Sequence, residues 1–429
     1  MVLALRTTWA LFLGMALLML ANGMQGTLLG VRAGLEGFPT AVTGLVMSGY
    51  FMGFLAGSAL APRLVRQVGH IRVFAALASL ISIAALVYAL QVDPVTWFAM
   101  RMVTGFASAG VYVVTESWLN DRADNRTRGQ LLALYMIVTL VAMGAGQFLL
   151  NLADPAGATL FIVGSILVSL SLIPLLLSAT PAPDFSAPKP LGIRALYRLT
   201  PLGVVASLGV GVSLGVLWGL AAVYAEAVGL PISRITLYVG ALFAGAILLQ
   251  WPLGSLSDRY DRRLILTLVT LCAAGAAGLA WIFPDRGFWV SAGFMAVIGG
   301  LCMPSYSLCV AYANDRLSPD QMVAASASLY FVFGIGSSLG PIAAGGLMSL
   351  IGPGGFHLML MLVNGLIGLF AIYRMSRRPA QALDEQTPSV MVGAQGSAVV
   401  TGLATEAACD EMAAESESSG SGRPQQSSV

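Results

Sequence analysis

Apolar stretches of about twenty residues, separated by short polar breaks, follow one another along the chain as far as residue 378. A stretch of that length crosses the ~30 Å hydrocarbon core of a bilayer as one α-helix. The pattern therefore predicts about twelve membrane-spanning helices. Their approximate ranges are 9–31, 41–62, 73–91, 95–118, 129–151, 158–178, 201–225, 235–256, 264–283, 288–311, 322–350 and 356–373.

The composition also indicates that lipid surrounds the protein. Hydrophobic residues make up 57% and charged residues 10% of the 429 positions, and the mean hydropathy is +0.83. Too few polar side chains remain to cover a surface in water, so we predict an all-α integral membrane protein. The 4 cysteines lack the CxxC spacing of a metal or redox site, and we expect them to serve packing.

The distribution of positive charge predicts the orientation. With both termini in the cytoplasm, Arg32, Arg234 and Arg286 fall outside, Arg101 lies within a span, and the rest of the 22 arginines and lysines lie inside. Cytoplasmic loops of membrane proteins carry such an excess. The first apolar run resembles a signal peptide, but it is longer than the apolar core of one, and we expect it to be the first span.

Short matches recur along the chain at a nearly constant spacing. Phe-Met-Gly at 51–53 and Phe-Ala-Gly at 243–245 are 192 residues apart, and Asn-Asp-Arg at 120–122 returns 194 residues later at 314–316. Matches in the same order predict two six-helix halves that run the same way through the membrane. We expect an N-terminal bundle at 1–178, a cytoplasmic linker at 179–200 and a C-terminal bundle at 201–378.

The linker and the C-terminal tail differ in composition from the bundles. Four prolines between 180 and 190 disfavour a continuous helix there, so we expect a semi-rigid linker. The tail, 379–429, holds seven acidic residues against Arg423 and is rich in Ser, Gly and Gln. This composition is typical of disordered segments, and we expect a disordered cytoplasmic tail.

The most specific motif is the charged turn Gly-Ser-Leu-Ser-Asp-Arg-Tyr-Asp-Arg-Arg at 254–263. It resembles the G-x-L-x-D-R-x-G-R-[RK] loop of the major facilitator superfamily, with Asp261 in place of the usual glycine. The first half has a divergent version at 62–72, Pro-Arg-Leu-Val-Arg-Gln-Val-Gly-His-Ile-Arg. A basic cytoplasmic turn would explain the arginines, but not the glycine, leucine and aspartate at these positions.

The resemblance implies gating residues on the cytoplasmic side, because in the family this loop clamps helix ends and influences switching between open states. The candidate gating residues are Arg66, Gly69, Arg72, Gly254, Asp258, Arg259 and Arg262. Arg66 stands where the family has aspartate, so a clamp in the first half must differ. We expect Glu116 to pair there with Arg66 or Arg72.

Two further stretches narrow the resemblance to the YcaD-like branch, namely Glu-Ser-Trp-Leu-Asn-Asp-Arg at 116–122 and Arg-Gly-Gln-Leu-Leu-Ala-Leu-Tyr-Met at 128–136. The resemblance covers residues 1–378. It implies a bacterial inner-membrane transporter with the superfamily's fold, twelve transmembrane helices in two six-helix bundles. It also implies alternating access to a central site formed mainly by spans 1, 4, 7 and 10.

Arg101 lies inside the fourth span, in a stretch that resembles the superfamily's R-x-x-x-G-x-[GA]-x-A signature. An arginine in the hydrocarbon region is costly unless it meets water, a ligand or a counter-charge, so we interpret it as functional. The alternative is a side chain that reaches outward to the interface. The expected substrate-cavity residues are Asn22, Gln25, Arg101, Ser108, Tyr112, Gln147, Trp218, Tyr306 and Tyr330.

Two carboxylates near the expected pathway, Glu116 and Glu226, are candidates for proton coupling, because a partly desolvated carboxyl group can titrate near neutral pH. The uncharged and aromatic polar side chains of the spans favour efflux of an amphipathic metabolite or drug over uptake. With Arg101, the two carboxylates would couple this efflux to protons, which makes the expected protein an antiporter. Two alternatives remain open. One is uptake of a sugar or an organic acid, with Arg101 as the anion ligand, and the other is a non-transporting sensor.

The chain has no ATP-binding loop, no metal-ligand spacing and no nucleophile paired with a base. We therefore expect neither an enzyme nor a bound cofactor. We expect a monomer in the lipid bilayer that binds a small-molecule substrate and protons, and no nucleic acid.

Overall fold

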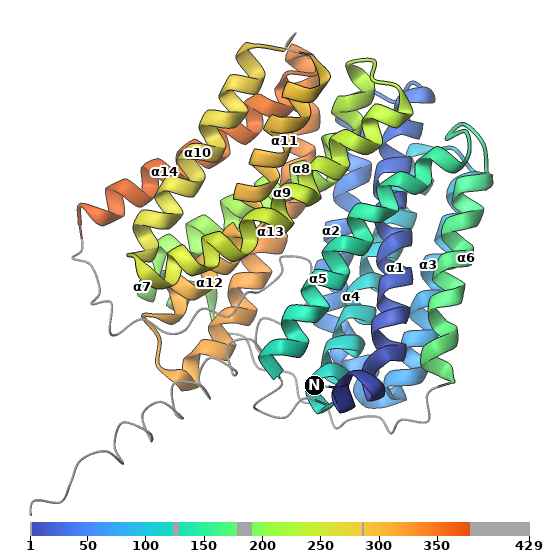
Figure 1. Ribbon diagram of the computed structural model, residues 1–429, viewed down its shortest axis with the longest axis horizontal. Coiled ribbons are helices and arrows are strands. Elements are labelled where there is room, and N and C mark those ends of the chain that lie inside the picture. The colour runs from blue at the N-terminus through green and yellow to red at the C-terminus, as the bar shows by residue number, and fades with distance from the viewer. Residues whose placement is uncertain (1, 123–127, 178–190, 285–286, 378–429) are drawn as a thin grey trace, which may run out of the picture.

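The computed structural model describes residues 2–122, 128–177, 191–284 and 287–377 (Figure 1). Helices and turns make up these residues, with no strand among them. Twelve helical segments are long and apolar enough to cross a membrane, as the hydrophobic pattern predicted. The proline-rich part of the expected linker, and the tail at 379–429 for which disorder was expected, lie outside the described residues.

The helices cover most of the predicted spans and extend past many of them. They are α1 (Val2–Leu35), α2 (Thr40–Val68), α3 (His70–Leu90), α4 (Pro94–Arg122), α5 (Arg128–Phe148), the 3-10 turn η1 (Leu149–Leu152), α6 (Thr159–Leu176), α7 (Ile193–Leu199), α8 (Pro201–Ala227), α9 (Ile232–Arg259), α10 (Arg262–Ile282), α11 (Phe288–Cys302), α12 (Ser305–Asn314), α13 (Pro319–Ile351) and α14 (Gly355–Met375).

The tenth span consists of two helices, α11 and α12. The break falls at Met303 and Pro304. Proline has no amide hydrogen to donate and its ring clashes with the preceding turn, so the helix is interrupted there.

The described end of the linker contains a short helix, α7, which the sequence pattern did not predict. Leu191, two residues before α7, is hydrogen-bonded to α13 of the second bundle through both its amide and its carbonyl. The amide of Leu191 donates to the carbonyl of Ala324 at 3.1 Å, and the Ser328 hydroxyl donates to the carbonyl of Leu191 at 2.6 Å. The buried side chain of Leu196 anchors α7 itself. This end of the linker therefore packs as part of the second bundle.

Glycines set the closest helix contacts in each half, and these contacts repeat. A Cβ on Gly53 of α2 would overlap the carbonyl oxygen of Met102 on α4, and a Cβ on Gly245 of α9 would overlap that of Ala296 on α11. Gly53 and Gly245 are the glycines of the two Phe-x-Gly matches, 192 residues apart. Small residues let helices approach closely in a membrane. The sequence repeat therefore marks a packing contact that both bundles share.

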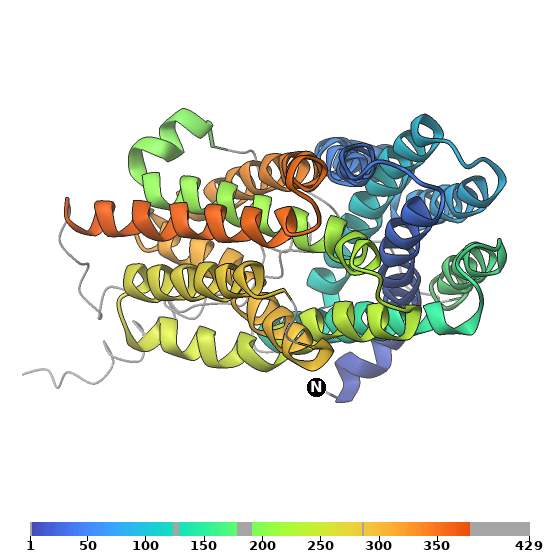
Figure 2. The ribbon, with the colours of Figure 1, turned by 90° about the horizontal axis from the view of Figure 1, so that it is seen from above.

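The two six-helix bundles, α1–α6 and α8–α14, meet at one end and diverge toward the end where the N-terminus lies (Figure 1). Seen from above, they stand side by side, with α13 against α2 (Figure 2). The Thr40 hydroxyl donates to the carbonyl of Gly345 at 3.2 Å, and the Asn151 amide donates to the Thr236 hydroxyl at 3.3 Å. Both hydrogen bonds join the bundles at the end away from the N-terminus, so the molecule is closed there.

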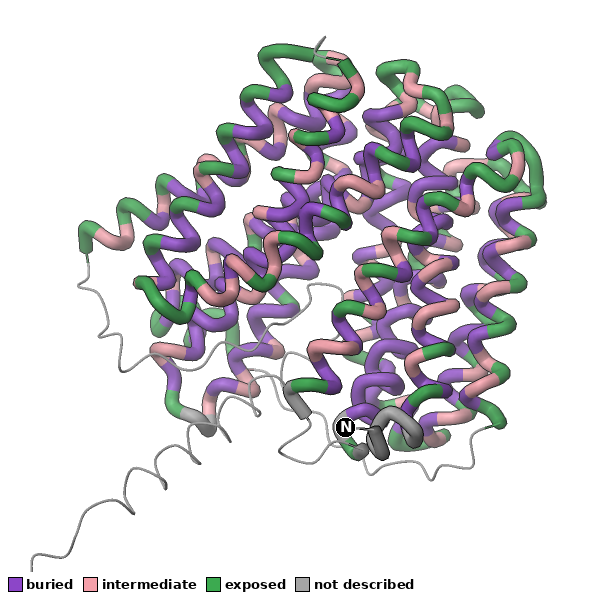
Figure 3. The backbone as a smooth tube through the Cα atoms, viewed as in Figure 1, coloured by how far each residue is buried: buried purple, intermediate pink, exposed green. Residues whose placement is uncertain are grey.

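Large apolar side chains remain exposed on the bundles, including Leu248 and Trp251 at 72% and Trp289 at 76%. Buried positions gather on the inward faces of the helices (Figure 3). A soluble monomer rarely exposes so much contiguous apolar surface, whereas acyl chains solvate it without cost. The fold and the composition thus agree on lipid as the surrounding medium.

Candidate functional site

A cavity lies between the two bundles. Its walls come from α1, α2, α4 and α5 of the first bundle and from α8, α9 and α13 of the second. Spans 1, 4 and 7 contribute as expected. The tenth span does not, and α2, α5, α9 and α13 line the cavity in addition. Because both bundles supply its walls, a movement of one bundle against the other changes its shape.

The structure brings six of the nine predicted cavity residues to this wall: Asn22, Arg101, Tyr112, Gln147, Trp218 and Tyr330. The other three, Gln25, Ser108 and Tyr306, are buried away from it, contrary to prediction. Tyr306 lies behind the wall, with its ring 4.8 Å from that of Phe333 and 5.9 Å from that of Tyr330. On α1 the residues next to Gln25, Gly26 and Thr27, face the cavity in its place.

Several aromatic residues of the wall were not predicted. Tyr50, Phe51 and Phe54 come from α2, and Phe243 comes from α9. The repeat held the signal for two of them, because Phe51 and Phe243 begin the Phe-x-Gly matches and occupy equivalent places in the two halves. Otherwise the sequence does not distinguish an aromatic side chain of a membrane helix that faces lipid from one that faces another helix or a cavity.

Arg101 keeps its positive charge on the cavity wall. Its side chain is 4% exposed, and its guanidinium carbon lies 4.7 Å from the centre of the Tyr50 ring. It makes no hydrogen bond or ion pair with any described residue, and its Nε has no acceptor there. A cation over an aromatic ring gains ~0.5–2 kcal/mol, less than the cost of moving an arginine out of water. The side chain turns into the cavity and does not reach the membrane surface.

Gln147 ties α5 to α1. Its amide donates to the carbonyls of Gly23 at 2.9 Å and Met143 at 3.1 Å, and its carbonyl oxygen accepts from the Thr27 hydroxyl. Both amide hydrogens are therefore used within the protein. Although Gln147 lines the cavity, its geometry is that of a residue that holds two helices in register.

The remaining polar groups of the wall include two whose hydrogen is not donated to any described residue. The Asn22 amide donates to the Tyr50 hydroxyl at 3.3 Å, and that hydroxyl keeps its own hydrogen for another acceptor. Trp218 stacks on Phe51, with ring centres 6.3 Å apart and planes 19° apart. The Nε1–H of Trp218 has no acceptor among the described residues. The wall thus carries, besides Arg101, two neutral donors without an acceptor among the described residues.

In the charged turn of the second half, at 254–263, Arg262 joins three helix ends. It is 2% exposed and donates to the carboxylate of Asp315, to the carbonyl of Ala311 at 3.2 Å and to the carboxylate of Asp258 at 3.3 Å. The side chain of Asp315 is 4% exposed and that of Asp258 is 44% exposed. Arg262 thereby holds the start of α10 to the ends of α9 and α12. Arg259 is exposed.

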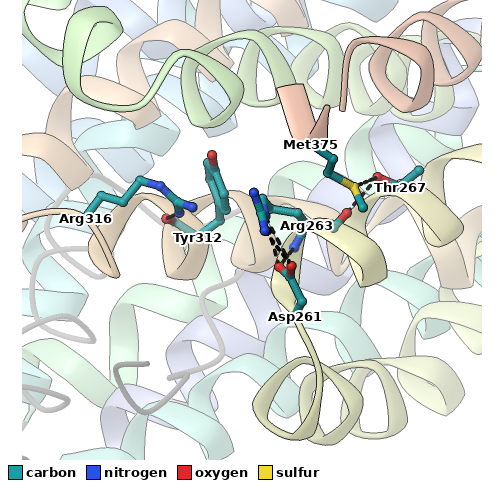
Figure 4. Close-up of polar contacts among 6 residues, drawn as sticks. All are labelled: Asp261, Arg263, Thr267, Tyr312, Arg316 and Met375. Carbon is teal, nitrogen blue, oxygen red and sulfur yellow. Dashed lines mark hydrogen bonds and ion pairs between the residues drawn. The ribbon is translucent and has the colours of Figure 1, made fainter. Parts of the chain in front are cut away.

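Asp261, the departure from the family motif, has its own structural role. Its φ is −54°, a backbone conformation that does not need glycine, and its carboxylate caps α10 by accepting from the amide of Arg263. It also pairs with the Arg263 guanidinium at 2.8 Å (Figure 4). Partial burial raises the pKa of Asp261, but the hydrogen bonds from Arg263 outweigh this and lower it overall. Nearby, the guanidinium of Arg316 lies 4.0 Å from the Tyr312 ring centre.

The first half is built differently at the equivalent turn. Gly69 has a φ of +91°, which only glycine adopts readily, so a glycine is required there. Arg66 and Arg72 are exposed and form no ion pair within the described part of the chain. The expected pairing of Glu116 with one of them is wrong for this structure. Glu116 is 0% exposed and accepts a hydrogen bond from the Tyr135 hydroxyl at 3.1 Å.

The second candidate carboxylate, Glu226, lies at the closed end of the molecule near the end of α8. It packs against α1, since a Cβ on Gly34 would overlap its carboxylate. The two carboxylates are therefore on different bundles, and neither lines the cavity.

A model of the Major Facilitator Superfamily matches the chain twice, over residues 11–204 and 199–407. An MFS-type transporter of Yersinia enterocolitica is 28% identical over 390 residues, which cover 90% of this chain and 99% of that protein. The MFS-type transporter YcaD of Escherichia fergusonii is 29% identical over 338 residues, covering 78% and 87%. An MFS-type transporter of an Enterobacter species is 31% identical over 345 residues, with the same coverage.

Solved structures agree on the fold. The nucleoside transporter NupG aligns with a TM-score of 0.74 at 15% identity, covering 86% of this chain and 98% of that one. A bacterial homologue of the human lysosomal transporter Spinster, in an inward-facing and occupied conformation, aligns with a TM-score of 0.69 at 17% identity, covering 88% and 97%. Together with the family matches over both halves, these similarities show that the chain belongs to the major facilitator superfamily and has YcaD among its relatives.

Proposed function

We propose that the chain is a secondary active transporter that carries an amphipathic small molecule through the cavity between the bundles by alternating access. The observation that carries the proposal is a cavity walled by both bundles in a molecule whose bundles are hydrogen-bonded to each other at one end. The aromatic wall suits an apolar body, and the few polar groups suit a small polar part.

The hydrogen bonds that the proposed cycle must break at the closed end are individually weak. The hydrogen bonds of Thr40 and Asn151 hold the bundles together there. Each is worth about 1 kcal/mol net, so substrate binding or a proton can shift the balance between two arrangements. With both termini in the cytoplasm, as we propose, the structure is the inward-facing state of a bacterial inner-membrane transporter.

The orientation has a direct test. In a cysteine-free background, Arg234→Cys and Arg259→Cys introduce single thiols on exposed positions at opposite ends. A membrane-impermeant maleimide added to spheroplasts, where the inner membrane faces the medium, should label residue 234 and spare residue 259 until the membrane is opened. Equal labelling of both positions, or the reverse pattern, would refute cytoplasmic termini.

We further propose that transport is proton-coupled efflux, with Glu116 as the proton site. The carboxylate is fully buried, is held by Tyr135, and lies one helical turn from Tyr112 on the cavity wall. Protonation would remove the charge that accepts from Tyr135, so the proton and the wall are linked through a short path. Glu226 is the second candidate, because it sits where the bundles meet.

Transport by purified protein in proteoliposomes tests both parts. A panel of labelled amphipathic compounds should include at least one that accumulates when an outward-directed or inward-directed proton gradient is imposed, and its direction identifies efflux or uptake. Glu116→Gln should keep exchange of that compound and lose its response to the gradient. Transport unaffected by a pH gradient in the unmodified protein would remove proton coupling, and absence of any specific flux would remove the transporter.

A further inference from the structure

The charge balance of the cavity wall points to a class of substrate. Arg101 is the one charged residue among those that line the cavity, and no carboxylate shares the wall with it within the described part of the chain. A buried cation without a counter-charge is unfavourable in a low-dielectric site. The wall is therefore electrostatically incomplete unless a ligand supplies a negative charge.

The hydrogen-bond inventory of the wall leads to the same class. The guanidinium of Arg101, the hydroxyl hydrogen of Tyr50 and the indole N–H of Trp218 have no acceptor among the described residues. Ring contacts connect the three side chains by way of Phe51. Arg101 lies over Tyr50 at 4.7 Å, Tyr50 meets Phe51 edge-on at 5.5 Å, and Phe51 stacks on Trp218 at 6.3 Å. The Arg101 guanidinium beside the Tyr50 hydroxyl fits an anionic group with several lone pairs.

The apolar part of the same wall fits the body of such a ligand. Phe54 meets Tyr112 at 5.8 Å and Tyr330 at 6.3 Å, so rings from both bundles surround the space beside Arg101. Rings of this kind pack well against aromatic or branched aliphatic groups. The site therefore offers one cationic, donor-rich corner and an aromatic remainder.

Resting on the transport function proposed above, we propose that the substrate is an amphipathic organic monoanion. Its acidic group binds Arg101, with the Tyr50 hydroxyl as a second donor, and its aromatic or aliphatic body lies against the ring-lined wall that includes Trp218. Trp218 belongs to the second bundle and Arg101 to the first. A ligand whose acidic group binds Arg101 and whose body packs against Trp218 would contact both bundles at once.

The test measures charge preference with matched pairs of probes. Naphthalene-2-carboxylate and 4-phenylbutyrate are each compared with their neutral carboxamide in titration calorimetry on the detergent-purified full chain. The unmodified protein should bind at least one carboxylate tenfold or more tightly than its carboxamide. Arg101→Gln should reduce that ratio to within twofold by weakening only the carboxylate, and Arg101→Lys should retain part of it. Arg234→Gln, which removes an exposed arginine outside the cavity, should keep the full ratio.

Two results would overturn the assignment: no carboxylate preferred over its carboxamide by the unmodified protein, or equal weakening of acid and amide by Arg101→Gln. Misfolding cannot imitate the expected result, because the carboxamide affinity is measured on the same variant. Flux of the same probes in proteoliposomes separates this inference from the transport function. Transport of the carboxamides as fast as the acids would refute the proposal of an anionic substrate and support the transport function. Selective binding of the acids without flux of any probe would support an anion site and refute the transport function.

Discussion

The two aspartates that Arg262 contacts should differ sharply in their importance for stability. The informative change is Asp315→Asn, with Asp258→Asn as the matched control, because both replace a carboxylate by an amide of the same shape around one arginine. The side chain of Asp315 is 4% exposed, whereas that of Asp258 is 44% exposed. Arg262 itself is 2% exposed, so it cannot recruit water freely in place of a lost partner.

The magnitudes follow from this burial. Breaking a buried ion pair by removing one partner costs ~3–5 kcal/mol, because the other charge is left uncompensated. Asp258 remains near Arg262 in Asp315→Asn, so we expect the lower end, about 3 kcal/mol. An exposed pair contributes ~0–1 kcal/mol, which is the expectation for Asp258→Asn. At an unfolding entropy of ~2.1 cal/mol/K per residue, Asp315→Asn should lower Tm by about 3 to 4 °C. Asp258→Asn should lower it by less than about 1.5 °C.

Tryptophan fluorescence during heating of the detergent-purified protein, at one fixed scan rate, measures both shifts. The double variant Arg262→Met with Asp315→Leu should unfold at a higher temperature than Arg262→Met alone, because replacing both charges by apolar groups leaves neither one unpaired. Equal Tm shifts for the two asparagine variants would refute the reasoning that burial decides the strength of this clamp. So would a double variant no more stable than Arg262→Met.

Two further predictions concern packing and pH. Gly53→Ala should cost ~1–3 kcal/mol of stability, because its Cβ would overlap the α4 backbone. The control is Gly275→Ala, where a Cβ meets nothing within 4 Å, and it should be neutral or slightly stabilising. Equal Tm values for the two variants would contradict the close contact at Gly53. The pKa of Asp261 is lowered in the folded protein by Arg263, so its stabilisation is present above the ordinary aspartate range near pH ~4 and is lost as the pH falls below it. Between about pH 5 and 3, the Tm of Asp261→Asn should therefore fall less than the Tm of the unmodified protein. Equal falls in Tm, measured by melting both proteins over this pH range, would contradict the role of Asp261 as a cap.

Much of the fold could be predicted from the sequence, and the reason is the solvent. In lipid each spanning segment must satisfy its own backbone hydrogen bonds, so length and hydropathy of a run are enough to identify a helix. The internal repeat could also be detected from the sequence. A close contact between helix backbones leaves no room for a side chain, so glycine is needed at the equivalent positions Gly53 and Gly245 of the two halves.

Partners across helices were harder to predict. The sequence suggested Arg66 or Arg72 for Glu116, but those arginines point outward and Tyr135 on the neighbouring helix is the partner that the structure shows. Tyr306 was expected in the cavity and lies one layer behind it. Both errors have one cause: within a membrane helix, polar and aromatic residues face lipid, neighbours and cavity without a simple period.

The sequence by itself determined the medium, the number and approximate ranges of the spans, the duplication and the superfamily, since each depends on composition or on spacing along the chain. The tertiary structure alone decided which side chains share the cavity and which charges meet. Thr27 and Gln147 are 120 residues apart, and Arg262 and Asp315 are 53 apart. Their meeting depends on how each helix is rotated and tilted against its neighbours, a property of the packed bundle that no single segment carries.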